Sequence, residues 1–368
     1  MELSVYIHFP FCKSKCAYCD FLSFAGREDL FGLYSDALEN EIISAAKRFS
    51  GHTVKTVFLG GGTPTLPDAA YTRSIIEVLY DNYDIDREVE FTAEANPETV
   101  GSDKLRDLRK SGVNRISFGV QSFDDGLLKR INRIHSAETA ISSYNMARQA
   151  GFDNINLDLM FALPGQTVED WMRTLETAVS VNPEHMSCYG LTVEAGTPLS
   201  RDKTFVPAND ETDRAMYRAA KDILNRAGYE HYEISNFAKG GFECRHNTVY
   251  WTGGEYAGFG LGAHSYINGV RWNNPESLDG YMNGAEKENI QSLTEGERRF
   301  EFVMLGLRMM RGISEDKFLC LFGKNIDYFY GEQLKTLETD RLITRKNGVI
   351  ALTSWGIDLS NKVFLDFL

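Results

Sequence analysis

The 368-residue sequence lacks the features that mark exported and membrane-spanning proteins. Its start, MELSVYIHFPF, has an early acid but neither the basic region nor the small-residue cleavage site of a secretory signal. No run approaches the ~20 apolar residues that a spanning helix needs. We therefore expect a cytoplasmic protein, and the sequence leaves open a homodimer and a peripheral association with a membrane.

Positive charge is also scarce. The chain has 39 Lys and Arg against 52 Asp and Glu, a net charge of −13, and no dense basic block. Such a chain repels phosphate backbones, so we expect no nucleic-acid partner. Six cysteines in a cytoplasmic protein indicate metal or redox chemistry before disulfides, and three of them fall within eight residues.

The repeating pattern is a β-like apolar run followed by a stretch with helical spacing, which is typical of a parallel sheet covered by helices. Strands are expected at 4–11, 54–60, 88–95, 115–122, 154–163 and 185–193, with helices at 30–49, 68–80, 102–111, 137–150 and 168–181. Six units cannot close an eight-stranded barrel. The sequence predicts an α/β protein with a partial six-stranded (β/α) barrel over 1–195, whose function lies at the C-terminal strand ends.

The pattern changes after the sixth unit. Residues 196–292 are expected to form a connecting and site-covering region with one helix at 210–227. A helix at 297–310 and a hairpin of 342–344 with 349–352 then predict a small, helical, winged-helix-like domain over 293–368. Acidic residues beside its few basic ones favour a packing or lid role over DNA binding.

Three cysteines stand where the first strand is expected to end. The segment CKSKCAYC lets one loop wrap the thiolates of Cys12, Cys16 and Cys19 around an iron–sulfur cubane. A fourth protein ligand is missing, so one iron would be open to a small molecule. The alternative is a Cys₃His zinc site with His8, although zinc ligands usually come as two separated pairs.

This signature resembles the cluster motif of the radical S-adenosylmethionine superfamily. Further segments stand in the order of its coproporphyrinogen-dehydrogenase-like branch: GGGTP at 60–64, EANP at 94–97, GVQSF at 119–123, NRIH at 132–135 and DLMFALPGQT at 158–167. The resemblance covers nearly the whole chain. It implies a 4Fe–4S cluster on the three cysteines, S-adenosylmethionine on the open iron, and a flavodoxin-type electron donor.

By the same resemblance, S-adenosylmethionine would contact Tyr6, Gly61, Gly62, Thr63, Glu94, Gln121, Arg133 and Asp158. Glycines permit close backbone approach, carboxylates suit ribose hydroxyls or the positive sulfonium and amino groups, and a guanidinium suits the carboxylate. Taken singly, GGGTP could be a plain strand-to-helix turn, and each charged residue could form a salt bridge or a strand-end cap.

Two groups in that branch need to be separated, the oxygen-independent coproporphyrinogen III oxidases and the haem chaperones called HemW. The oxidase pattern has a further cysteine two residues after the third and a longer lead into the first strand. Here that position is Phe21, and the first strand begins almost at Met1. The segment HNTVYW at 246–251 resembles the HNxxYW motif of the chaperones. The motif residues that would bind haem are His246, Asn247, Tyr250 and Trp251.

We therefore expect a haem chaperone that passes haem to acceptor proteins, and we assign no catalytic residue. The alternatives are the oxidase itself and a radical methyltransferase that opens haem. The HN segment could also merely cap backbone groups beside a packed Trp. His264 is a second candidate ligand, while Cys188, Cys244 and Cys320 are expected to be buried or tolerated.

Overall fold

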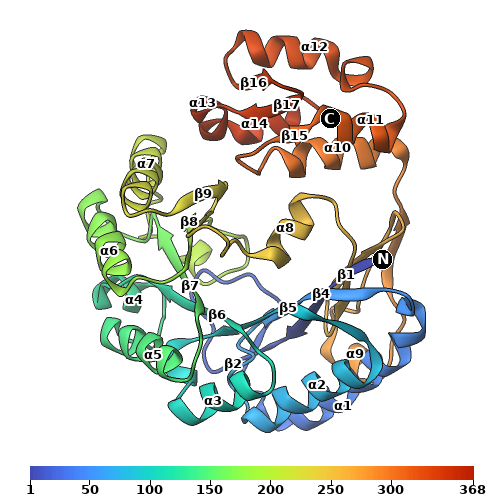
Figure 1. Ribbon diagram of the computed structural model, residues 1–368. Coiled ribbons are helices and arrows are strands. Elements are labelled where there is room, and N and C mark those ends of the chain that lie inside the picture. Colours follow the sequence, from blue (N-terminus) through green and yellow to red (C-terminus); the bar gives the residue numbers. More distant parts are fainter.

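Six parallel strands, each followed by a helix, form the centre of the molecule (Figure 1). The computed structural model describes residues 1–368. The strands pair in chain order: β1 (Glu2–Phe9), β4 (Thr53–Gly61), β5 (Asp84–Ala95), β6 (Arg115–Gln121), β7 (Asn154–Phe161) and β8 (His185–Gly190). The helices between them are α1 (Phe31–Ala45), α2 (Ala69–Asn82), α3 (Ser102–Lys110), the short α4 (Asp125–Arg130), α5 (Ala137–Gln149) and α6 (Val168–Val181). The predicted partial barrel is confirmed.

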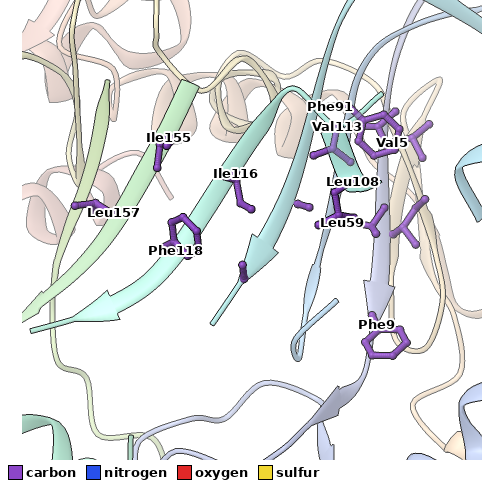
Figure 2. Packing of buried hydrophobic residues seen from close by; sticks show 14 of the residues in the cluster. Val5, Phe9, Leu59, Phe91, Leu108, Val113, Ile116, Phe118, Ile155 and Leu157 are labelled. Atoms are coloured by element: carbon purple, nitrogen blue, oxygen red, sulfur yellow. The ribbon is translucent and has the colours of Figure 1, made fainter. Parts of the chain in front are cut away.

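Alternate residues of these strands face opposite environments, because successive side chains point to opposite faces of a sheet. The outward set is apolar and packs under the helices in a core of 52 buried residues. Figure 2 shows part of this layer, where Ile116 and Phe118 of β6 lie between Leu59 of β4 and Leu157 of β7. The inward set is polar instead. Parallel strands covered on both faces usually carry apolar residues throughout, so this polar interior marks the site.

Residues 196–292 extend the sheet at both edges, which the sequence analysis did not predict. The elements are α7 (Asp210–Arg226), β9 (Glu230–Glu233), β10 (Asn236–Ala238), α8 (Arg245–Trp251), β11 (Tyr256–Phe259), β12 (His264–Ile267), β13 (Val270–Asn273), α9 (Leu278–Met282) and β14 (Glu288–Ser292). β10 pairs with β8 and β11 with β1, so the sheet has twelve strands. These added strands have three to five residues, which is too short for periodicity to reveal.

The C-terminal segment forms a separate core of 14 buried residues. Its elements are α10 (Glu295–Gly306), β15 (Ile313–Ser314), α11 (Glu315–Phe322), α12 (Ile326–Thr339), β16 (Ile343–Lys346), β17 (Val349–Leu352), α13 (Ser354–Asp358) and α14 (Ser360–Leu365). The predicted hairpin is β16–β17, where Asn347 and Gly348 both have positive φ, as a tight two-residue turn requires. Figure 1 shows this domain facing the barrel across α8. None of the helices combines the length and apolar character needed to cross a bilayer.

Candidate cofactor site at the strand ends

A cavity of about 500 Å³ lies at the carboxyl ends of the parallel strands. It brings together ten of the residues singled out from the sequence: Cys12, Cys16, Cys19, Gly61, Gly62, Glu94, Gln121, Arg133, Asp158 and Asn247. Its volume lies within the range of about 300–1,000 Å³ that is usual for small-molecule and cofactor sites. The predicted location of the site at the strand ends therefore agrees with the geometry.

Strand pairing holds the two ends of the cysteine loop, and hydrogen bonds hold its middle. Short strands β2 (Phe11–Cys12) and β3 (Phe24–Ala25) pair with each other and close the loop. Arg133 donates from Nη1 to the Cys16 sulfur at 3.4 Å, and from Nη2 to the Gly119 carbonyl oxygen. The side-chain amide of Asn132 donates a hydrogen bond to the Lys15 carbonyl oxygen at 2.8 Å. The NRIH segment thus holds the thiol-bearing loop against β6.

The thiols fit an iron–sulfur cluster better than a single zinc ion. Zinc needs four donors about 2.0–2.3 Å from one point, and no three His, Cys, Asp or Glu side chains converge in this way. His8 is already engaged, with Nδ1 2.9 Å from the Tyr6 hydroxyl and Nε2 2.8 Å from the Leu22 carbonyl oxygen. In a cubane each thiolate binds a different iron, so three thiols spread around one loop are suitable donors.

Burial raises the pKa of the Cys12 and Cys19 thiols. A thiol must lose its proton to bind iron, and a bound metal provides the positive charge that stabilises the thiolate. Arg133 adds fixed positive charge beside Cys16, and its Nε is buried without a hydrogen-bond partner. The unpaired donor is an orphaned group of the kind that a bound carboxylate would satisfy.

The glycines of GGGTP are required by the packing of the cysteine loop. A Cβ on Gly62 would lie 2.6 Å from the Phe11 carbonyl oxygen, and one on Gly61 would lie 2.5 Å from the His8 ring. The Gly62 and Thr63 amides donate to the carbonyl oxygens of Phe9 and Phe11 at 2.7 and 2.8 Å. The motif therefore fixes the position of the chain just before Cys12. It also leaves the backbone of Gly61 and Gly62 at the cavity wall. Thr63 does not line the cavity, and its hydroxyl contacts the Cys12 sulfur at 3.6 Å.

Two half-buried carboxylates, those of Glu94 and Asp158, lie on the floor of the cavity. Glu94 accepts a hydrogen bond from the backbone amide of Gly61 at 3.0 Å. Asp158 accepts one from the side-chain amide of Asn156 at 2.7 Å. Burial and then the neighbouring Asp158 raise the pKa of Glu94 to about 8, and burial also raises the pKa of Asp158. A ligand that brings positive charge would restore the ionised forms, because an opposite charge lowers a carboxyl pKa.

Several site residues escaped the sequence analysis. Arg115 is 2% exposed on β6, and Ser117, Asn156 and Ser187 join the hydrogen-bonded network around Asp158. Tyr189 donates to the Gln121 side chain at 2.9 Å, and Gln121 has a φ of 66°. The signal that could have found the strand residues is the polar half of the alternation within β6, β7 and β8.

The helix α8 carries HNTVYW and is held at its start by one buried carboxylate. Glu90 of β5, which is 6% exposed, accepts hydrogen bonds from the Arg245 and His246 amides, both at 2.9 Å. Such a carboxylate satisfies amides that have no partner inside the helix. Glu90 therefore fixes the position of α8 over the barrel, and the sequence analysis did not single it out.

His246 is 1% exposed and both of its ring nitrogens are engaged. Nδ1 lies 2.8 Å from the Thr56 hydroxyl, and Nε2 lies 2.9 Å from the Tyr250 hydroxyl. The ring also stacks on Phe58, with centroids 5.1 Å apart. Burial lowers the pKa of His246 to about 3, with a smaller contribution from Arg115. The imidazole is neutral, and iron could reach Nε2 only after the Tyr250 contact opened.

The HNxxYW residues divide between two sides of α8. His246, Asn247 and Tyr250 line a cavity of about 230 Å³ that also includes Tyr6, and it meets the larger one at Glu94, Asp158 and Asn247. Trp251 instead faces the C-terminal domain, where the Arg308 guanidinium lies 4.3 Å from its ring centroid. Tyr250 and Trp251 therefore do not line a common cavity. His264 is exposed on β12 and lines neither of these two cavities.

The remaining cysteines lie outside the cavity. Cys188 and Cys244 are buried and Cys320 is exposed, as free thiols. Burial raises the pKa of Cys244 to about 12, so it is held as a neutral thiol beside Glu90.

Comparison with known proteins identifies the family. The Radical SAM superfamily profile matches residues 6–178, and the HemN C-terminal domain profile matches residues 293–359. The heme chaperone HemW of Bacillus subtilis is 37% identical, over 99% of this chain and 99% of its own. The heme chaperone HemW of Escherichia coli is 33% identical, over 100% of this chain and 97% of its own.

The chain belongs to the HemW family of radical SAM proteins. Among solved structures, coproporphyrinogen III oxidase (HemN) from Escherichia coli, a radical SAM enzyme, is 25% identical with a TM-score of 0.88, over 99% of this chain and 89% of its own. The HemW family and the oxidase thus share this fold, including the C-terminal domain. Fold alone does not separate their functions, so the separation depends on particular residues.

Proposed function

We propose that the protein is a haem chaperone that binds haem, together with a 4Fe–4S cluster and S-adenosylmethionine, and passes the haem to acceptor proteins. The observation that carries this proposal is the likeness to heme chaperones of the HemW family over the full length of both chains. A residue-level feature supports it. Phe21 lines the cavity with 60% of its surface exposed, where the oxidase pattern has a further cysteine.

In this proposal Cys12, Cys16 and Cys19 hold the cluster and leave one iron free for S-adenosylmethionine. When reduced, such a cluster supplies one electron to the bound cofactor. The chain's own residues orient the cofactor: the carboxylates attract its positive groups, Arg133 binds its carboxylate, and the backbone of 61–62 approaches closely. The full proposed set is Tyr6, Gly61, Gly62, Thr63, Glu94, Gln121, Arg133 and Asp158.

We also propose a flavodoxin-type electron donor and a cytoplasmic location. The cysteines of the loop are only partly buried, and Lys13 and Lys15 stand beside them in an otherwise acidic chain. Local positive charge of this kind attracts a donor with an acidic docking face. We further propose a homodimer, which sedimentation tests, and a peripheral membrane contact, which vesicle binding tests.

The second candidate function is coproporphyrinogen III oxidation, which the structural likeness to HemN favours. The test is anaerobic reconstitution with iron and sulfide, followed by incubation with S-adenosylmethionine, a reductant and coproporphyrinogen III. We expect no protoporphyrinogen, and a Soret shift when haem is added instead. Catalytic amounts of decarboxylated product would establish the oxidase. Methyl transfer from S-adenosylmethionine to haem would establish the methyltransferase.

For His246 the sequence motif and the observed contacts lead to different expectations. As the axial haem ligand it must leave Tyr250, and His246→Ala then abolishes the Soret shift. As a positioning residue for α8 it stays buried, and His246→Ala leaves the wavelength of the haem spectrum unchanged. His264→Ala, at the exposed second candidate ligand, tests the alternative: loss of the Soret shift there instead would assign the ligand to His264.

A further inference from the structure

A third cavity, of about 300 Å³, lies between the end of α8 and the C-terminal domain. Its apolar wall consists of Trp251 from α8 together with Phe302, Met309, Ile313 and Val349 from the C-terminal segment. The Trp251 indole Nε1 is buried and has no hydrogen-bond partner. The cavity therefore has an apolar, partly aromatic wall, which suits a flat apolar ligand, and the Arg308 guanidinium lies 4.3 Å from the Trp251 ring centroid.

The charged side chains of this cavity are all cationic. Arg311 and Lys317 line it, and no Asp or Glu does. Both are exposed, and neither belongs to any of the chain's ion pairs. Lys317 Nζ donates to the Thr252 carbonyl oxygen at 3.4 Å and lies 5.9 Å from the Phe302 ring centroid. In a chain with a net charge of −13, a cavity edge with two free cations favours an anionic ligand.

The space available exceeds the cavity itself. An adjoining cavity of about 870 Å³ shares Thr252, Met309 and Arg311 with it, so the two meet along this edge. A ligand too large for the first can extend into the second. The two together offer space for a macrocycle. Because Glu2, Glu230 and Glu243 line the adjoining cavity, the carboxylates of an anionic ligand belong at the edge formed by Arg311 and Lys317.

From these observations we infer that haem binds in the cleft between α8 and the C-terminal domain, with its ring against Trp251 and its propionates beside Arg311 and Lys317. This inference rests on the proposed haem-chaperone function and adds a site to it. It places haem and S-adenosylmethionine on opposite sides of the seven-residue helix α8. His246, Asn247 and Tyr250 then face the cofactor, while Trp251 faces the haem.

The test is haem titration of the reconstituted protein and of Arg311→Ala/Lys317→Ala, followed by Soret absorption. We expect the dissociation constant of the double variant to rise about tenfold, the change that corresponds to about 1.4 kcal/mol. The matched control is Lys335→Ala/Lys362→Ala, which removes two exposed cations of the same domain away from the cleft. Iron, sulfide and S-adenosylmethionine binding should be unchanged in both, which verifies the fold.

A second experiment removes the negative charge of the propionates from the ligand. Haem dimethyl ester, in mild detergent, lacks both carboxylates, so the unaltered protein and the cleft variant should bind it equally. Equal haem affinity in the two proteins would overturn the assigned site while the chaperone function stood. An equal loss for haem and its ester would overturn the carboxylate contacts. The absence of any Soret shift in the unaltered protein would instead refute the proposed function itself.

Discussion

The cavities on the two sides of α8 differ in the charge that they present. On the barrel side the walls carry three thiols and the carboxylates of Glu94 and Asp158. On the other side the walls carry an indole, a phenyl ring and two free cations, with no carboxylate. The first environment suits a cationic cofactor and a metal cluster, and the second suits an apolar anion. One short helix thus separates two sites of opposite preference.

This difference also explains the spacing of the HNxxYW motif. Consecutive helix residues point in directions about 100° apart, and in α8 this step carries Trp251 out of the cavity that Tyr250 lines and into the cavity on the other side. The first residues of the motif belong to the hydrogen-bonded interior of the barrel, and the last belongs to the interface with the C-terminal domain. α8 is therefore the common wall of both sites.

The largest expected effect is the loss of the cluster without a change in haem affinity, which would show that the two cavities bind independently. Cys16→Ser should reduce bound iron and sulfide to background after anaerobic reconstitution, because the cluster loses one of its three thiolates. Haem affinity should be unchanged, since no thiol lines the cleft. Cys320→Ser, at an exposed thiol of α11, is the control and should retain full iron. Full iron in Cys16→Ser would remove the basis for the cluster site.

The next largest effect is on S-adenosylmethionine affinity and concerns Glu94 on the floor of the barrel cavity. Glu94→Gln should weaken S-adenosylmethionine binding by roughly 10- to 100-fold, since a hydrogen bond to a charged group contributes about 1.5–3 kcal/mol. Equilibrium dialysis against labelled cofactor measures it, with Glu286→Gln at an exposed position as the control. Haem affinity should not change. A parallel loss of haem binding would show that the two cavities are not independent.

The same carboxyl group predicts a pH dependence of stability. Its pKa is about 8 in the folded chain against an ordinary value of 4.5, so the folded state holds a proton that the unfolded state has released between these values. The free energy of unfolding of cofactor-free protein should therefore fall as pH rises from about 5 to 8. Urea titrations at several pH values should show a shallower decline for Glu94→Gln. Identical pH profiles would mean that Glu94 is ionised throughout.

The smallest expected effect is on stability and tests how Glu90 holds α8, the helix that forms a wall of both cavities. Glu90→Gln should cost about 1–2 kcal/mol in the free energy of unfolding, because a charged acceptor of two helix amides becomes neutral. Hydrogen exchange of the α8 amides should accelerate, and both ligands should bind more weakly. Glu88→Gln makes the same chemical change at an exposed position of the same strand. Unaltered exchange in α8 would show that other contacts position it.

Much of the barrel could be predicted from the sequence, because its signals are local. The apolar halves of the six strands and the helical spacing between them gave the βα order, and the cysteine loop follows the first strand directly. By contrast, the strands at the sheet edges were missed because each is too short to show a period. The polar partners Arg115 and Asn156 were missed because only their neighbours on other strands give them a role.

The sequence by itself thus determined the order of the βα units and the thiol-bearing loop, since each depends on residues a few positions apart. Tertiary structure alone decided that α8 stands between a cofactor cavity and a cationic cleft. A seven-residue helix cannot encode its own orientation. Glu90, more than 150 residues earlier in the chain, fixes one end, and the C-terminal domain covers the other.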